Sequence, residues 1–397
     1  MWLKKNEPEN YHRTVKIMLP HDYLNYHLSG GAVHAMERGD CSGMGGILSL
    51  GSNSLNAELM HFISPDLASK LPVAIADPHT AIGSVHEDIW QGLFPGEHVT
   101  SGESAGDSGR HVVLLAPGCG DNAMSTLAIT SLVSASTEVS CPSAASPLIL
   151  SLGTSGTLCS VSPSPLIDLS GGIAPFCDST GNYLPLICIQ NCSLVPEEVR
   201  KTFPHLSRDA ITALAAQEPP GCEGVLLLPY FSEGGERTPN WPGATGCFLG
   251  LRQGHLQRPG LLYRAALESV SFALLRGHRR MVQHGLPALL PDGDSKISLV
   301  GGGLNNLLWR QIIADVFQAT VEVHDPQVTT KASAVGAALQ AAAVALGVPV
   351  GQVPLVLTEG SVQAVCYHPT RDTEMNKVYD AAFQRHVSIS NSLFGGE

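Results

Sequence analysis

The chain has 397 residues, which is enough for two or three domains and excludes a single small module. Apolar residues make up 44% of the chain and charged residues only 15%, so we expect much of it to be buried. The net charge of −12 comes without basic clusters, which argues against binding of nucleic acid and of anionic membranes. A small-molecule enzyme fits this balance better. An anionic ligand would need a local site of backbone N–H groups or individual cations.

Ten cysteines are scattered along the chain without a CxxC pair, which is typical of reduced, mostly buried thiols rather than of a zinc site. The N-terminal residues lack the apolar core of a signal peptide. The most apolar long stretch, Ala332–Leu346, is too short to span a bilayer. We therefore expect a cytoplasmic protein that binds neither a membrane nor nucleic acid.

The first half of the chain carries short helical patterns between glycine-rich loops. In chain order we predict two short helices between Pro8 and Leu28 with a break at Pro20, a glycine-rich segment over Arg38–Ser54, a helix over Leu55–Ile63, a polar loop over Thr100–Arg110, a buried strand over His111–Ala116 and a helix over Ala123–Leu132. The tripeptide Arg38-Gly39-Asp40 matches a cell-adhesion motif, which we interpret as coincidence. Ser131–Pro147 is rich in serine and contains two prolines, so we place a domain boundary there.

The second half alternates strands and helices. In chain order we predict a hairpin of Leu148–Leu152 and Thr157–Ser162, strands over Leu184–Gln190 and Gly224–Phe231, a long helix over Pro259–His284, a strand over Ile297–Val300, a helix over Asn306–Phe317, a strand over Thr320–His324, a helix over Lys331–Leu346 and a last helix over Arg371–His386. This alternation indicates an α/β fold in two lobes, with ligands bound at the glycine loops that follow strands.

Three glycine-containing loops follow apolar strands, namely Gly118–Asn122, Gly153–Gly156 and Gly301–Asn306. Glycine lets the backbone approach a phosphate closely, so such loops can form a phosphate site, although each by itself also fits an ordinary turn. None matches a P-loop or a complete GxGxxG pattern, so neither standard nucleotide-binding fold is indicated. The Gly153–Gly156 loop also differs from the GxSxG nucleophile elbow, which disfavours a serine hydrolase.

Asp121 is the candidate catalytic residue of the first loop. A carboxylate directly after a strand could accept the proton of a hydroxyl group as its oxygen attacks a γ-phosphate, and it could help to hold a metal ion. The alternative is an Asx-turn or helix cap that serves Ala123 and Met124. Arg237, in Glu236–Pro239, could lie near a phosphate or fix a turn, and the turn is the more usual role of a single arginine.

Several segments together resemble the FGGY family of carbohydrate kinases. They are MLPHDYLNYHLSG, AMERGDCSGMGG, APGCGDNAMSTLAI, LSLGTSGTL, LLLPYFSEGGERTPNW, GCFLGL, LVGGGLNNLLWRQIIADVF and SAVGAALQAA, and they cover nearly the whole chain in the family's order. Within the family the chain is most similar to members that phosphorylate D-xylulose. The resemblance implies an actin-like ATPase fold, in which two ribonuclease H-like lobes close over MgATP and a sugar.

The resemblance also implies the role of each candidate residue. Asp121 would be the general base, would contact the sugar together with Asn122, and would help to hold Mg²⁺. The hairpin turn of Gly153, Thr154, Ser155 and Gly156 would contact the β- and γ-phosphates of ATP, and Gly301, Gly302, Gly303 and Asn306 would hold the adenosine. The expected partners are the sugar and ATP, and the cofactors are ATP and Mg²⁺. A homodimer is possible.

The sequence departs from the family at its start. The Asp-x-Gly-Thr phosphate loop, the Met-His-Gly-like segment and the Trp-Asn-Asp-like segment of the family are not in this sequence, so we expect an incomplete first lobe. The expected organisation is a remainder of the N-terminal lobe over 1–131, a linker over 132–147, a C-terminal nucleotide lobe over 148–368 and a closing helix and tail over 369–397. A non-catalytic nucleotide-binding remnant, or a kinase for another ketose or polyol, stays open as an alternative.

Overall fold

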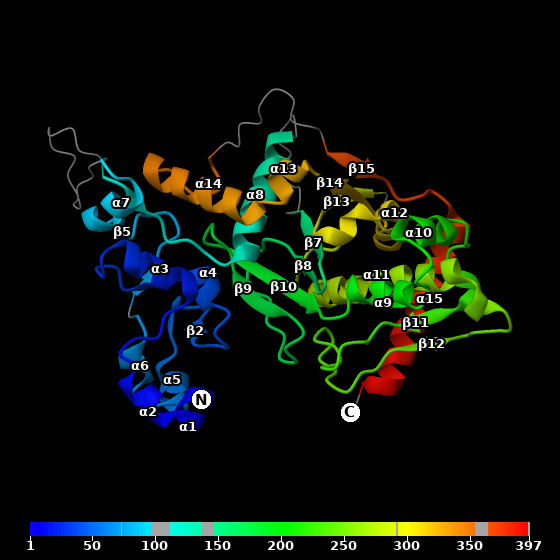
Figure 1. The fold of residues 1–397 in the computed structure, drawn as a ribbon, viewed down its shortest axis with the longest axis horizontal. Coiled ribbons are helices and arrows are strands. Elements are labelled where there is room, and N and C mark those ends of the chain that lie inside the picture. The colour runs from blue at the N-terminus through cyan, green and yellow to red at the C-terminus, as the bar shows by residue number, and fades with distance from the viewer. Residues whose placement is uncertain (73, 97–111, 137–146, 291–292, 354–363, 396–397) are drawn as a thin grey trace.

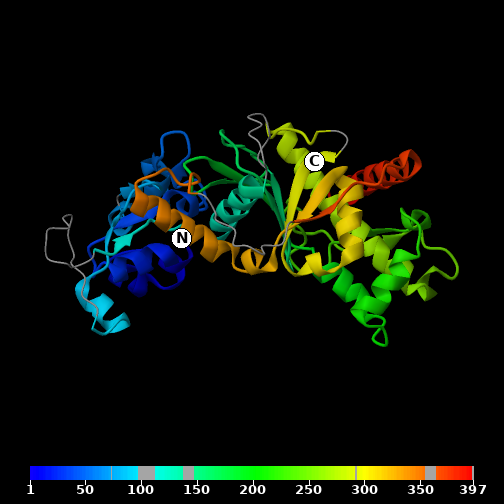
Figure 2. The same ribbon diagram turned by 90° about the horizontal axis from the view of Figure 1, so that it is seen from above.

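The computed structural model describes residues 1–72, 74–96, 112–136, 147–290, 293–353 and 364–395. The N-terminal third forms the group of short helices drawn in blue and cyan, and the rest of the chain builds a larger body around a central sheet (Figure 1). Seen from above, the two parts lie side by side and helix α14 extends from the larger body over the smaller one (Figure 2). The loop predicted over 100–110 lies outside the described residues.

The central sheet has seven strands in the order β15-β14-β13-β7-β8-β10-β9. The strands are β7 (Leu148–Leu152), β8 (Gly156–Cys159), β9 (Ala174–Cys177), β10 (Tyr183–Ile189), β13 (Gly293–Val300), β14 (Ala319–Val323) and β15 (Val365–Tyr367). Strand β13 pairs in parallel with β7 and with β14, and the other neighbours are antiparallel. The predicted hairpin is confirmed, because Leu152 pairs with Gly156 across the turn of three residues.

Helices cover both faces of this sheet, as the alternation of side chains in β7 requires. Leu148, Leu150 and Leu152 are buried in one core with α11 (Pro259–Gln283) and α12 (Leu307–Phe317). Ile149 points to the other face, into a core with α8 (Asp121–Ser136). Helix α14 (Ala332–Leu346) packs along α8. Both faces of the sheet are therefore buried, which is typical of α/β proteins.

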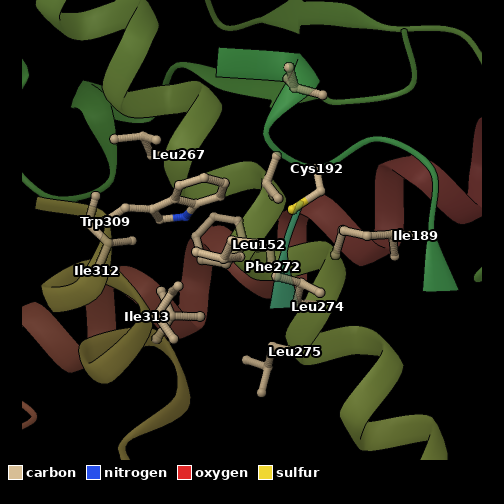
Figure 3. Packing of buried hydrophobic residues seen from close by; sticks show 14 of the residues in the cluster. Leu152, Ile189, Cys192, Leu267, Phe272, Leu274, Leu275, Trp309, Ile312 and Ile313 are labelled. Atoms are coloured by element: carbon tan, nitrogen blue, oxygen red, sulfur yellow. The ribbon is translucent and has the colours of Figure 1, made fainter. Parts of the chain in front are cut away.

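Helix α11 is the centre of the larger core. It was predicted from the apolar face of Leu262, Ala266, Val270 and Ala273, and all four side chains are buried. Phe272 of α11 packs in one apolar cluster with Trp309, Ile312 and Ile313 of α12 and with Leu152 of β7 (Figure 3). The indole N–H of Trp309 donates to Ser271 Oγ at 3.0 Å, so its one polar atom is satisfied in the core.

The N-terminal part consists of short elements. They are α1 (Trp2–Asn6), α2 (Pro8–Arg13), α3 (Pro20–Leu28), β1 (Ala35–Glu37), α4 (Arg38–Cys41), β2 (Leu48–Ser49), β3 (Ser54–Leu55), α5 (Ala57–Ile63), α6 (Leu67–Lys70), β4 (Ala74–Ala76), β5 (Gly83–Ser84), α7 (Glu87–Leu93) and β6 (Leu114–Leu115). The helices predicted before Leu28 and within 55–63 are confirmed. Residue 111 of the strand predicted over 111–116 lies outside the described residues, and within 112–116 the strand is limited to the two residues of β6, which pair with β5.

Four further differences concern the lengths of elements. Helix α8 continues to Ser136, so residues 132–136 of the predicted linker are helical, and 137–146 lie outside the described residues. The strand predicted over 224–231 is β11 (Leu226–Leu228), which pairs with β12 (Cys247–Leu249). Strand β13 begins at Gly293 rather than at 297. The last helix, α15, extends from Thr373 to Phe394 rather than ending at 386.

The remaining elements are α9 (Leu194–Lys201), α10 (Arg208–Ala216), η1 (Cys222–Gly224), η2 (His255–Gln257), η3 (Gly302–Asn305) and α13 (Pro326–Thr329). Among the described residues, no helix has both the length and the apolar character needed to cross a membrane.

Candidate active site

Two of the predicted glycine loops meet at one edge of the central sheet. Strands β7 and β13 are parallel neighbours, with Ser151 opposite Val300, so the turn after β7 and the loop after β13 leave the sheet at the same end. The contact is close, because a Cβ atom on Gly301 would lie 2.9 Å from the carbonyl carbon of Leu152. Gly301 also has φ +89°, a backbone angle that favours glycine. The structure thus joins segments that are about 150 residues apart in the sequence into one loop cluster.

The backbone of the turn after β7 is fixed by hydrogen bonds to the segment before α9, whereas the side chains at its tip are exposed. The carbonyl oxygen of Gly153 accepts hydrogen bonds from the backbone N (3.1 Å) and the Oγ (2.6 Å) of Ser193, at the start of α9. The carbonyl of Thr154 accepts from Cys192 N at 3.3 Å. A Cβ on Gly156 would lie 2.9 Å from Cys192 Sγ, so only glycine fits there. Thr154 and Ser155 themselves are exposed, and their hydroxyl groups can reach a ligand.

In the loop after β13, Gly302 is exposed, whereas Asn306 holds the loop against neighbouring helices. At Gly302, also exposed, a Cβ would meet nothing within 4 Å, so a ligand can approach the backbone. Asn306 is the N-cap of α12, since its Oδ1 accepts from Trp309 N at 3.1 Å. Its Nδ2 donates at 3.3 Å both to Thr212 Oγ1 and to Tyr263 Oη. The side chain of Asn306 thus holds the loop against α10 and α11, a use that the sequence did not indicate.

Asp121 is the first residue of α8 and is exposed, as is Asn122. Its Oδ1 accepts from the backbone N (2.8 Å) and the Nδ2 (3.2 Å) of Asn122. The predicted alternative of a cap on Ala123 and Met124 differs from this geometry, because Met124 N donates to the carbonyl oxygen of Gly120 instead. Both hydrogen bonds of the carboxylate use Oδ1, so Oδ2 is the oxygen that accepts none among the described residues.

The loop that carries Asp121 is held by α14. The backbone N–H of Gly118, which has φ +80°, donates to Gln340 Oε1 at 2.9 Å. Ser333 Oγ donates to the carbonyl oxygen of Asp121 at 3.2 Å. Since α14 follows β14 of the central sheet, the position of Asp121 depends on the same sheet that carries the two glycine loops.

A group of charged side chains, His21, Asp22 and Asp40, lies next to this loop. These residues were not among the candidates predicted from the sequence. His21 Nδ1 is 3.1 Å from Asp40 Oδ2, and His21 Nε2 is 3.0 Å from Asp22 Oδ1. A Cβ on Gly120 would lie 3.0 Å from Asp40 Oδ1, which places that carboxylate beside the residue before Asp121. Burial lowers the pKa of His21, but the carboxylates of Asp22 and Asp40 outweigh it and raise the pKa to about 10. His21 is therefore an imidazolium at neutral pH.

The backbone around Asp40 is fixed by a buried carboxylate. Glu37 accepts from the backbone N–H groups of Gly39 (2.7 Å) and Asp40 (3.0 Å), and so caps α4. Burial raises the pKa of Glu37. A Cβ on Gly39 would overlap Cys119 Sγ, so α4 packs directly on the loop before Asp121. The tripeptide Arg38-Gly39-Asp40 lies in α4 and thus supports this loop.

Glu236, in the segment with Arg237, has a structural role. It is buried, and it accepts from Gln190 N (2.7 Å), Arg237 N (2.7 Å) and Asn191 Nδ2 (2.9 Å). Asn191 Oδ1 in turn accepts from the backbone N–H groups of Phe231 (2.8 Å) and Ser232 (2.7 Å). The Arg237 side chain is exposed, with Nη1 3.7 Å from Cys188 Sγ. The carboxylate beside Arg237 therefore fixes the turn.

The amino-acid sequence is similar to those of known carbohydrate kinases. The model of the C-terminal domain of the FGGY family of carbohydrate kinases matches residues 148–345. A xylulose kinase of Haemophilus influenzae is 31% identical over 341 residues, which are 86% of this chain and 61% of that protein. A gluconokinase of Bacillus licheniformis is 28% identical over 188 residues, which are 44% of this chain and 35% of that protein.

Among solved structures, the xylulose kinase from Bifidobacterium adolescentis aligns with a TM-score of 0.75 at 27% identity. The alignment covers 96% of this chain and 71% of that one. This likeness confirms the predicted actin-like α/β fold of a sugar kinase. The chain spans 61% of the length of the Haemophilus relative.

Proposed function

Because the chain belongs to the FGGY family of carbohydrate kinases, we propose that it transfers the γ-phosphoryl group of ATP to D-xylulose. The product would be xylulose 5-phosphate. The observation that carries the proposal is the loop cluster at the sheet edge, in which Gly301 lies against the backbone of Leu152, the residue directly before the turn of Gly153–Gly156. Open backbone and hydroxyl groups of this kind bind phosphates without a net positive field, which this chain of charge −12 lacks.

Asp121 is the proposed general base. As the hydroxyl oxygen of the sugar forms its bond to the γ-phosphorus, the bond from that phosphorus to the β–γ bridging oxygen breaks, and ADP leaves with the electron pair. The hydroxyl proton passes to Oδ2 of Asp121, since Oδ1 already accepts two hydrogen bonds from Asn122. Asn122, exposed beside it, is the proposed second contact to the sugar.

Nucleotide binding is proposed for the loop cluster. Thr154 and Ser155 would contact the β- and γ-phosphates through their hydroxyl and backbone N–H groups, and Gly302 would let the nucleotide approach the backbone. Asn306 would act indirectly, because its amide is used to hold the loop on α10 and α11.

Magnesium fits this site only as a partner of the nucleotide. Among the described residues there is no group of three or more His, Cys, Asp or Glu side chains that could hold a metal ion. Mg²⁺ in kinases is commonly bound by one or two carboxylates together with substrate phosphates and waters, and an exposed carboxylate such as Asp121 can supply one of these ligands. The ion would neutralise phosphate charge during transfer.

The proposal is tested by ADP release from the purified chain with ATP and a panel of D-xylulose, gluconate, ribulose and glycerol. We expect turnover with D-xylulose that Asp121→Asn lowers by a factor of at least about 10², whereas the matched control Asp88→Asn, a carboxylate that is 90% exposed on α7, leaves it unchanged. Turnover with gluconate instead would favour the second candidate, which the gluconokinase relative supports. A folded chain that binds ATP without turnover on any sugar would show a non-catalytic nucleotide-binding protein.

A further inference from the structure

A second polar pocket lies away from the loop cluster, between α11 and α15. Its volume is about 310 Å³. Both helices belong to the right-hand part of the molecule in Figure 1. The side chains that matter for its chemistry are those of Arg276, Arg279, Arg280, Gln283, Gln384 and Asn391. We call it the arginine pocket.

Two of its guanidinium groups stack on aromatic rings. The guanidinium carbon of Arg276 lies 4.4 Å from the ring centre of Trp241, and that of Arg279 lies 4.2 Å from the ring centre of Phe383. Stacking fixes the plane of a guanidinium through its face and leaves the N–H groups at its edge for other partners. A guanidinium group whose plane is fixed in this way can bind a phosphate through the N–H groups at its edge.

The edge of Arg276 is incompletely used. Its Nη2 donates to the neutral Oδ1 of Asn391 at 2.6 Å. Its Nη1 is buried, with no hydrogen-bond partner among the residues that the structure describes. Burial, together with the nearby positive charge of Arg280, lowers the pKa of Arg276. A buried positive charge without an anionic partner is unfavourable, and the negative charge of an anion bound in the pocket would offset it.

The charges around the pocket do not cancel. Arg280 is paired, since its Nε and Nη2 are 2.5 and 2.7 Å from the two oxygens of Asp168, whose side chain is 2% exposed. Among the carboxylates that the structure describes, Arg279 has only a distant partner, Asp380 at 4.0 Å, whose side chain is 75% exposed. No carboxylate among the described residues lies within ion-pair distance of Arg276. A positive excess is thus concentrated in one pocket of a chain whose net charge is −12.

From these observations we infer that the arginine pocket binds a small phosphorylated anion, with the phosphate between Arg276 and Arg279. The exposed amides of Gln283 and Gln384 are placed to bind hydroxyl groups of the same ligand. The volume lies at the small end of ligand pockets, which suits a sugar phosphate or inorganic phosphate rather than a nucleotide. The inference does not depend on the proposed kinase activity.

The test is isothermal titration of the full chain with ribose 5-phosphate, inorganic phosphate and unphosphorylated ribose. We expect both phosphates to bind and ribose not to bind. Tighter binding of ribose 5-phosphate would identify a sugar phosphate as the ligand, and equal binding would identify phosphate alone. Two variants remove the site without touching the core. Arg279→Gln deletes a charge that is 44% exposed, and Gln384→Glu places a carboxylate beside the guanidinium groups.

Each variant should weaken phosphate binding by at least about tenfold, because a charge-assisted bidentate contact is worth more than one such factor. The control Arg371→Gln removes an exposed arginine elsewhere, changes the net charge equally and should leave binding intact. Urea unfolding of each variant shows that it is folded. Absence of phosphate binding by the unmodified chain would overturn the inference. Binding by Gln384→Glu that equals that of the unmodified chain would also overturn it, because the phosphate would then lie elsewhere, for example at the glycine loops.

Discussion

The contact between α8 and α14 gives the sharpest prediction, because it holds the loop of Asp121 and depends on one glycine. A Cβ added to Gly336 of α14 would lie 2.6 Å from the carbonyl carbon of Met124 in α8 and closer still to its oxygen. Real Cβ contacts essentially never fall under 3.0 Å, and these are backbone atoms that no change of rotamer can move. Gly336→Ala therefore has to push the two helices apart.

The expected cost follows from three effects. Overpacking of a close contact costs about 1–3 kcal/mol. Separation of the helices also lengthens the hydrogen bonds of Ser333 to Ser125 Oγ (2.8 Å) and to the Asp121 carbonyl (3.2 Å), each worth about 1 kcal/mol. Alanine has a helix propensity about 1 kcal/mol better than glycine, which offsets part of this. We expect Gly336→Ala to lower the free energy of unfolding by about 2–4 kcal/mol.

The measurement is urea unfolding followed by far-UV circular dichroism, with Gly92→Ala as the matched control. Gly92 is also helical, in α7, but a Cβ there would meet nothing within 4 Å. That control should be neutral or more stable by up to about 1 kcal/mol. If Gly336→Ala proved as stable as Gly92→Ala, the close packing of α8 on α14, and with it the support of the Asp121 loop, would be refuted.

Two further predictions concern pH. The pKa of His21 is raised to about 10, so the stability that its imidazolium contributes is complete below its unfolded pKa of about 6.5 and is lost as the pH rises toward 10. The stability difference between the wild type and His21→Gln should accordingly be larger at pH 6 than at pH 10.5, and an equal difference at both would contradict the ion pairs. The pKa of Asp168 is lowered by its hydrogen bonds to Arg280, so its contribution is complete above an unfolded pKa of about 3.9 and is lost as the pH falls below that. Asp168→Asn should cost roughly 2–4 kcal/mol at pH 7 in urea unfolding, and this cost should shrink between pH 4 and pH 2.

Elements with a strong local pattern could be predicted from the sequence. The β7–β8 hairpin follows from two β-type runs around a small-residue turn, and α11 follows from its apolar face and from Pro259 at its start. Helix α8 was predicted too short, because its serine-rich end is typical of a linker. In the structure the helix continues from Leu132, which is buried in the core with β7 and β10, to Ser136. The contact of Leu132 anchors this end of the helix although serine has a weak helix propensity.

The loops of the candidate site could be predicted singly, but their meeting could not. Gly301 lies on Leu152 because β13 pairs in parallel with β7, and no local pattern reports that pairing. The same holds for His21 and Asp40, which reach the loop before Asp121 from far along the chain. The spacing of the three arginines of the arginine pocket places them on one face of α11. The sequence does not indicate that Arg280 pairs with Asp168 while the other two stack on aromatic rings, because these partners come from distant parts of the chain.

The most direct test of the central claim is phosphorus NMR of the chain mixed with ATP, Mg²⁺ and D-xylulose. The account predicts that the γ-phosphate signal of ATP is replaced by the signals of ADP and of a sugar phosphate monoester, and that Asp121→Asn abolishes the monoester signal. Unchanged ATP with a folded chain, or release of inorganic phosphate without any sugar phosphate, would contradict it.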